Sequence, residues 1–190
     1  MLGAVACSGP ARQEVGSDAT VPANVPPSST EADTAGFTGT MDPVERGSDA
    51  SVVTTLAAVR TAPGAGRDFE RVVFELDGAS LPPYVVRYDT EPPTQCGSGQ
   101  PVHVAGDATL TIQLHRTRAH AERDGAMTPT ITDRDRRLEQ PVMRQLTLVC
   151  DFEGEVTWVL GLAGRRPFRV LELASPARLA VDVGGAPPAR

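Results

Sequence analysis

The stretch DFEGEVTWVLGLAGRRPFRVLELASPARLAVDV, residues 151–183, decides the fold. Apolar residues alternate with polar ones along it, Gly-Arg-Arg-Pro at 164–167 provides a turn, and the single Trp of the chain lies within it. Alternation of this kind is typical of strands with one buried face. The stretch therefore predicts three consecutive strands, a β-meander against which the upstream sequence packs.

The sequence upstream of the meander predicts further short strands separated by Pro and Gly turns. Alternation is cleanest at 69–76 and 108–114. β-Branched or apolar residues favour other strands at 51–60, 84–88 and 142–150, with a short edge strand at 102–104. A short helix is the alternative at 51–60. No long helix is indicated. The pattern predicts an all-β sandwich of about eight or nine short strands.

Composition divides the chain into a polar segment and a domain. Residues 7–50 contain two Arg, seven acidic residues and almost no large apolar side chains, which predicts a disordered tether because such a segment cannot bury enough apolar surface to fold. Residues 51–190 carry sixteen Arg against seventeen acidic residues and predict one compact domain. This near-neutral balance argues against a nucleic-acid partner, which requires a concentrated basic surface.

The first residues, MLGAVACSGP, resemble the end of a bacterial lipoprotein signal. In that resemblance residues 1–6 are the remnant of a signal peptide, and Cys7 is the lipidated first residue of the mature protein. The favoured Leu three positions before the cysteine is absent, as are the basic region and the full apolar segment. The start predicts a membrane-anchored, extracytoplasmic protein, with an accidental terminal cysteine as the alternative.

The other two cysteines, Cys96 and Cys150, form an even pair. An extracytoplasmic location favours a disulfide between them, because that compartment oxidises paired thiols. A catalytic thiol needs a nearby base, and a structural zinc needs two more ligands at suitable spacing. The sequence shows neither, so the disulfide is the favoured interpretation.

Six segments together resemble the AMIN-like domain of actinobacterial lipoproteins and secreted proteins. They are FERVVFELDG at 69–78, PPYVVRY at 82–88, GSGQPVHVAGDATLTIQL at 97–114, DFEGEVTWVLGL at 151–162, RRPFRVLEL at 165–173 and RLAVDV at 178–183. The resemblance spans nearly all of 51–190 and implies a β-sandwich that directs proteins to the cell envelope through peptidoglycan or associated polymers. It brings no catalytic residues, metal or cofactor. We therefore expect a non-enzymatic module whose partner is a cell-wall polymer or an envelope protein.

Three side chains are candidate ligand contacts. Trp158 can stack on a sugar ring if it is exposed, but its apolar neighbours favour a position in the core. Arg165 and Arg166, at the turn before Pro167, can bind anionic wall polymers, although turn arginines are commonly only solvated.

Less favoured functions rest on other charged residues. Asp151 and Glu153 are a carboxylate pair that could hydrolyse glycan. His115 and His120, with nearby acids, could bind a metal, but neither a helix nor a strand brings them onto one face. Residues 116–140 are rich in Arg and acids and predict a long exposed excursion, with a short helix at 117–123 as an alternative. That excursion is the candidate surface for a protein partner.

Overall fold

The computed structural model describes residues 37–47, 52–63 and 68–185. The fold is all-β, and the described residues include no helix, so none of them forms a helix that could cross a membrane. The strands are β1 (Val44–Arg46), β2 (Thr54–Ala62), β3 (Phe69–Asp77), β4 (Tyr84–Tyr88), β5 (Ala108–His115), β6 (Thr117–Arg118), β7 (His120–Arg123), β8 (Ala126–Pro129), β9 (Asp135–Arg137), β10 (Met143–Phe152), β11 (Glu155–Leu162), β12 (Phe168–Leu173) and β13 (Arg178–Gly184).

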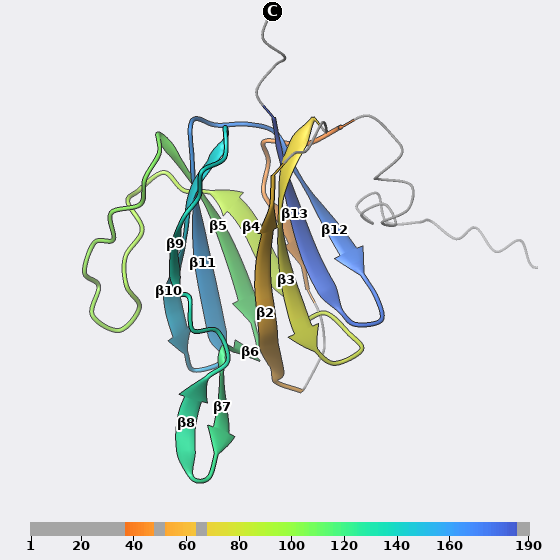
Figure 1. Ribbon diagram of the computed structural model, residues 1–190, viewed down its shortest axis with the longest axis vertical. Coiled ribbons are helices and arrows are strands. Elements are labelled where there is room, and N and C mark those ends of the chain that lie inside the picture. The colour runs from red at the N-terminus through yellow and green to blue at the C-terminus, as the bar shows by residue number, and fades with distance from the viewer. Residues whose placement is uncertain (1–36, 48–51, 64–67, 186–190) are drawn as a thin grey trace, which may run out of the picture.

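Two sheets face each other as a sandwich (Figure 1). The six-stranded sheet has the order β1-β4-β5-β11-β10-β9, and the five-stranded sheet has the order β12-β13-β3-β2-β6. All neighbours pair antiparallel except β2 and β6, which are parallel. β7 and β8 form a separate hairpin that projects from one end of the sandwich (Figure 1).

The shared core lies between the sheets and follows from the period-two alternation of their strands. Leu110, Ile112 and Leu114 of β5 point into it, as do Leu179 and Val181 of β13, and all five are fully buried. Trp158 of β11 lies in the same core with no exposed surface, and its ring centroid is 6.3 Å from that of Phe74. The outward residues of the same strands form the two outer faces of the sandwich.

Polar contacts between the sheets close both sides of the core. The buried carboxylate of Glu70 accepts hydrogen bonds from the backbone N–H groups of Val142 and Met143, at 2.9 and 2.6 Å. The Tyr84 hydroxyl donates to Glu172 at 2.8 Å, and Arg46 pairs with the same carboxylate.

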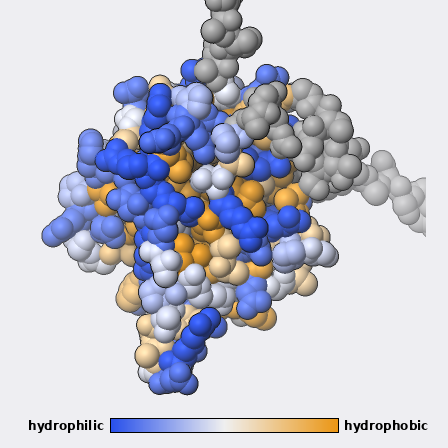
Figure 2. All heavy atoms as spheres, in the orientation of Figure 1, coloured by the Kyte–Doolittle hydropathy of each residue, from blue (hydrophilic) through white to orange (hydrophobic). Residues whose placement is uncertain are grey.

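In Figure 2 hydrophilic residues gather over the β9 side of the visible face, and hydrophobic residues show between β9 and β2.

Three consecutive strands were predicted correctly within 151–183, as β11, β12 and β13, but the β-meander was wrong. β11 belongs to the six-stranded sheet, whereas β12 and β13 pair with each other in the five-stranded sheet, so the turn after β11 crosses from one sheet to the other. The strands expected at 51–60, 69–76, 84–88, 108–114 and 142–150 are also confirmed, as β2, β3, β4, β5 and β10.

Two local predictions were wrong. Residues 102–104 form no strand, because Val102 and Val104 instead pack against the outer face of the six-stranded sheet. Residues 116–140 are neither one exposed loop nor a helix at 117–123, since they form β6 to β9. β6 is an edge strand of the five-stranded sheet, and β9 is an edge strand of the six-stranded sheet. These strands raise the number in the described residues to thirteen, above the expected eight or nine.

Part of the segment that was expected to be a tether pairs with the sandwich, before the expected domain start at residue 51. β1 pairs with β4, and Thr40 pairs with Phe168 through a backbone bridge. Residues 40–46 therefore pass from the edge of one sheet to the edge of the other. Residues 1–36 lie outside the described residues.

Candidate binding groove

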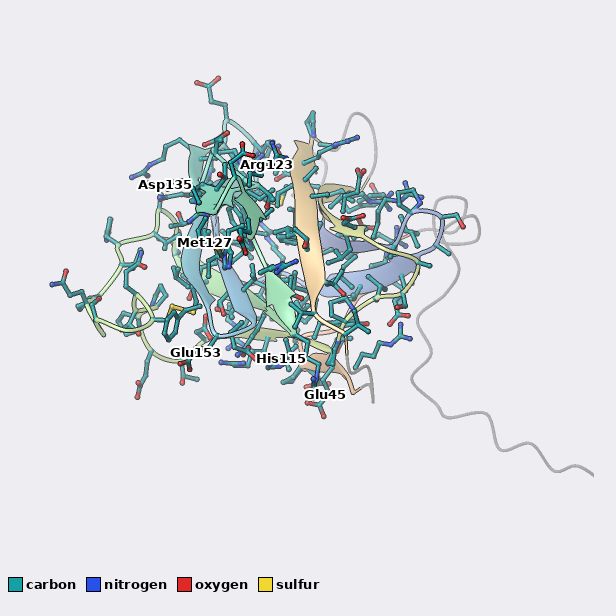
Figure 3. The ribbon with its side chains drawn as sticks, turned by 90° about the horizontal axis from the view of Figure 1, so that it is seen from below. Glu45, His115, Arg123, Met127, Asp135 and Glu153 are labelled. Atoms are coloured by element: carbon teal, nitrogen blue, oxygen red, sulfur yellow. A yellow bond between two sulfur atoms is a disulfide. The ribbon has the colours of Figure 1, made fainter. Side chains whose placement is uncertain are left out.

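The outer face of the six-stranded sheet presents a row of polar side chains. Arg87, Thr111, Gln113 and Thr157 alternate with core residues on β4, β5 and β11, and cross-strand pairing places Arg87 opposite Thr111 and Gln113 opposite Thr157. In Figure 3, Glu45 on β1 and Asp135 on β9 mark the two edges of this sheet, and His115 and Glu153 lie between these edges. The alternation that builds the core thus also assembles a polar surface.

A long loop, residues 89–107, crosses this outer face, and we refer to it as the strap. A disulfide joins Cys96 of the strap to Cys150 of β10, as predicted, with the two Cα atoms 5.1 Å apart. The backbone N–H of Cys96 donates to the carbonyl of Val149 at 3.1 Å, and the N–H of Ala105 donates to the Gln145 side chain at 2.7 Å. The strap is therefore fixed to the sheet at two separate places.

Apolar packing and a glycine also allow the strap to lie close to the sheet. Val104 packs with Val149 and Val159 in a small cluster outside the main core. A Cβ atom added to Gly161 of β11 would collide with the backbone carbonyl of Ala105. Glycine at this position allows the strap backbone to lie directly on the strand.

A groove of about 570 Å³ lies between the strap and the polar row. Asp89, Glu91 and Thr94 line it from the strap, and Pro92 and Pro93 add apolar surface. The sheet contributes Arg87, Tyr88, Thr111, Gln113, Thr157, Val149 and Val159. We call this the polar groove.

Hydrogen bonds order the polar side chains along the groove and beyond it. The guanidinium of Arg87 donates to the Gln113 side-chain oxygen at 3.4 Å, and the Gln113 amide donates to Glu155 at 3.1 Å. Nδ1 of His115 lies 2.8 Å from the same carboxylate. The side chain of Arg87 remains 43% exposed and is available to a ligand.

Asp89 is the most buried charged group of the groove, with a side chain that is 15% exposed. Burial raises the pKa of its carboxyl group, while the Thr111 hydroxyl, which donates to it, and Arg87, whose Nε is 3.8 Å away, oppose that rise. A partly desolvated carboxylate beside a hydroxyl and a guanidinium is suited to accepting hydrogen bonds from ligand hydroxyl or amide groups.

The predicted arginine turn packs on Tyr88, whose side chain points from β4 toward the core. Its hydroxyl donates to the carbonyl of Arg166 at 2.7 Å and accepts from the Arg166 N–H at 2.9 Å. The Arg165 guanidinium stacks over the Tyr88 ring, 4.6 Å from its centroid. Burial raises the pKa of the Tyr88 hydroxyl despite this basic turn. Arg165 and Arg166 thus contact the core-facing side chain of Tyr88, and neither residue lines the polar groove.

A second groove, of about 660 Å³, lies on the other side of the strap beside the disulfide. Val102, Leu148 and Val149 give it an apolar floor, and Arg134 and Phe152 lie at its walls. Phe152 is 58% exposed. This groove has fewer outward hydrogen-bonding groups than the polar groove.

The remaining sequence candidates are dispersed. Trp158 is fully buried, which confirms the core interpretation and leaves no face for a sugar ring. Glu153 is exposed in the β10–β11 turn, whereas Asp151 has an 8% exposed side chain that binds the Ala119 N–H, His120 and Arg134. These two carboxylates therefore do not share an environment. Cys7 lies outside the described residues.

The two histidines that were considered as metal ligands have different carboxylate partners. His115 contacts Glu155, and His120 contacts Asp151 at 2.8 Å. His103 is exposed on the strap. Within residues 37–47, 52–63 and 68–185, no group of three or more His, Cys, Asp or Glu side chains is placed to hold a metal ion.

The sequence analysis missed the residues that form the polar groove. The signal was the polar half of each alternating strand, such as Thr109, Thr111 and Gln113 between the apolar residues of 108–114. That pattern indicates an outward face, but it does not show which outward faces adjoin. The adjacency follows from the pairing of β4, β5 and β11 and from the disulfide that places the strap.

Comparison with known families gives one match. The model of the AMIN-like domain family matches residues 54–185, which is more than half of the chain. No curated protein and no solved structure shows a significant match.

Proposed function

The chain belongs to the AMIN-like domain family, and from that premise we propose that it is a non-catalytic module that binds cell-wall glycan in the polar groove. Membership of the family indicates, in general terms, a cell-wall-related binding module with an extracytoplasmic location at the cell envelope. The choice of peptidoglycan as the polymer and of the polar groove as the site is our proposal.

The observation that carries the proposal is the composition of the groove. Arg87, Asp89, Thr111 and Gln113 present guanidinium, carboxylate, hydroxyl and amide groups from adjacent positions. Wall glycans carry many hydroxyl and acetamido groups, which pair with such donors and acceptors. Pro92 and Pro93 supply apolar surface for the faces of sugar rings. Polar groups that converge beside an apolar wall are the usual composition of a ligand site.

The disulfide agrees with the proposed location. Cys96–Cys150 fixes the strap that forms one wall of the groove, and such bonds persist in oxidising compartments outside the cytoplasm. We further propose that lipid on Cys7 anchors the protein to the membrane. This second proposal rests on the lipoprotein-like sequence around Cys7.

The test is sedimentation of the oxidised full-length protein, carrying Cys7→Ser for solubility, with purified cell wall. The wall is used intact and after removal of its anionic polymers. We expect retention on both preparations, and we expect Arg87→Ala and Gln113→Ala each to lower the affinity about ten-fold, the effect of losing one charge-assisted hydrogen bond. Arg60→Ala is the matched control, because Arg60 lies on the opposite sheet and is 70% exposed. Equal retention of all variants would exclude the polar groove as the site.

An anionic wall polymer is the second candidate ligand, favoured by the exposed Arg165 in the turn between β11 and β12. In that case retention disappears when the anionic polymers are removed, and Arg165→Ala weakens binding more than Gln113→Ala does. Retention on the stripped wall that is unchanged in Arg165→Ala excludes this candidate.

A protein partner in the envelope is the third candidate. The β7–β8 hairpin projects from the sandwich, and Met127 near its tip is 62% exposed (Figure 1). If this hairpin binds the partner, shortening residues 122–127 to a two-residue turn abolishes capture of that partner and leaves wall retention unchanged. Loss of wall retention in the same variant would instead assign the hairpin to polymer binding.

A further inference from the structure

The charged side chains that line the polar groove do not balance. Among these described lining residues Arg87 is the cation, and Asp89 and Glu91 are the anions. Glu155, whose carboxylate accepts from the Gln113 amide, adds a further anion just beyond the lining residues. The groove therefore has an excess of negative charge, and both of its own acidic residues belong to the strap.

The guanidinium of Arg87 is already committed to partners inside the groove. Its Nε lies 3.8 Å from the Asp89 carboxylate, and its Nη1 donates to the Gln113 side-chain oxygen at 3.4 Å. Asp89 also accepts from the Thr111 hydroxyl. Glu91 is exposed, and no side chain in the described part of the chain forms an ion pair or hydrogen bond with its carboxylate. Arg87 thus offsets part of the charge of Asp89 and leaves that of Glu91 uncompensated.

The backbone fixes where the two acidic residues lie. The N–H of Asp89 donates to the carbonyl of Thr109 at 3.2 Å, which extends the pairing of β4 with β5 by one residue. Glu91 follows two positions later and directly precedes Pro92 and Pro93, whose rings restrict the backbone. Both acids therefore line the groove from one ordered part of the strap.

We propose that the polar groove selects wall polymers that carry a primary ammonium group, an inference that rests on the proposed function. A carboxylate only accepts hydrogen bonds, whereas an ammonium group supplies three donors and a positive charge. An acetamido group is neutral and offers one N–H, and a phosphate has the same sign of charge as the two acids. The groove therefore favours an amino sugar without its acetyl group over the acetylated sugar.

Asp89 gains most from a cationic ligand. Burial raises the pKa of its carboxyl group, and a second positive charge beside it favours the ionised form, as Arg87 already does. The Asp89 side chain is 15% exposed, whereas Glu91 is fully classed among the exposed residues. Because solvent and salt screen a partly buried pair less than an exposed one, Asp89 should contribute more to the selectivity than Glu91.

The experiment compares matched ligands by calorimetry with the oxidised full-length protein carrying Cys7→Ser. A glucosamine oligomer and an N-acetylglucosamine oligomer of equal length are titrated at about pH 6, where primary amines are protonated. A short peptide with blocked ends and a single lysine, with its amine free or acetylated, tests a peptide stem as the source of the ammonium group. We expect the amino oligomer to bind about ten-fold more tightly than the acetylated one.

Variants of the two acids identify the contact. Asp89→Asn should lower the preference for the amino oligomer about five-fold and Glu91→Gln about two-fold, since each removes a charge at nearly constant side-chain size. Glu139→Gln is the matched control, because Glu139 is exposed and lies outside the groove, and it should leave the preference unchanged. Circular dichroism reports whether each variant is folded.

The outcomes separate this inference from the proposed function. Equal affinity for the two oligomers, with Arg87→Ala weakening both, would overturn the ammonium selectivity and leave the glycan site intact. A preference that persists undiminished in Asp89→Asn and in Glu91→Gln would also overturn it. If neither oligomer nor the peptide binds, the inference fails, and loss of wall retention would then overturn the proposed function as well. Tighter binding of the free-amine peptide than of the amino oligomer would support the inference and assign the ammonium group to a peptide stem.

Discussion

Cys96 and Cys150, separated by 54 positions in the sequence, are disulfide-bonded with their Cα atoms 5.1 Å apart. The bond fixes the strap to β10 and so maintains one wall of the polar groove. Replacing both cysteines with serine should lower the free energy of unfolding by about 4 kcal/mol, because the unfolded chain regains the freedom of a long loop. Urea unfolding of the Cys7→Ser parent and the triple-serine variant measures this difference. Identical unfolding free energies would show that the strap is held by its noncovalent contacts.

Gly161→Ala tests how closely the strap must approach the sheet. A methyl group at this position collides with the Ala105 carbonyl, so the strap has to shift outward. We expect a loss of about 1–3 kcal/mol in unfolding free energy together with weaker wall retention. Gly47→Ala is the control, because a Cβ there meets no atom within 4 Å. Normal stability and normal retention in Gly161→Ala would contradict the role assigned to the strap.

Asp182→Asn tests the buried charges on the outer face of the five-stranded sheet. The fully buried Asp182 carboxylate accepts from Nε of Arg71 at 2.5 Å and from Nε of Arg169 at 2.8 Å. The substitution leaves positive charge without its buried counterion and should cost about 3–5 kcal/mol in thermal or chemical unfolding. Glu75→Gln, which breaks the more exposed pair with Arg60, should cost no more than about 1 kcal/mol. Equal losses of unfolding free energy in Asp182→Asn and Glu75→Gln would contradict this prediction.

Asp89 should make the free energy of unfolding decrease as the pH rises. Burial raises the carboxyl pKa above its ordinary value of 3.8, so the folded state retains this proton to higher pH than the unfolded state does. The stabilising contribution is fully present below pH 3.8 and is lost as the pH rises through the raised folded-state pKa. Unfolding free energies of the parent and Asp89→Asn between pH 3 and 7 should therefore diverge as the pH increases, with the parent losing stability relative to the variant. Parallel curves would show that the pKa of Asp89 is the same in the folded and unfolded states.

Trp158→Phe tests whether the indole ring serves only to pack the core or also contacts a sugar ligand. Trp158 is fully buried, and its Nε1 has no hydrogen-bond partner within the described part of the chain. Removing an unpaired buried donor offsets part of the lost packing, so we expect a change in unfolding free energy below about 2 kcal/mol. Wall retention should not change. Loss of retention in a variant of normal stability would restore Trp158 as a ligand contact.

Local patterns in the sequence were sufficient to predict much of the sandwich. The alternation in 69–76, 108–114 and 151–183 identified β3, β5 and the three C-terminal strands, since period two places one set of side chains in the core. It did not show that β11 and β12 belong to different sheets. Residues 37–47 and 116–140 gave no such signal. Their short strands are formed by pairing with longer strands, as β1 does with β4 and β9 with β10, and their own composition is polar.

The sequence by itself determined the all-β class, the three C-terminal strands, the cysteine pair and the family, because these depend on neighbouring residues or on the order of motifs along the chain. Only the tertiary structure decided that Arg87, Gln113 and Thr157 share one groove with Asp89 of the strap. These residues come from segments up to 70 positions apart in the sequence. Strand register, sheet order and a disulfide bring them together, and each of these depends on long-range pairing that local alternation does not specify.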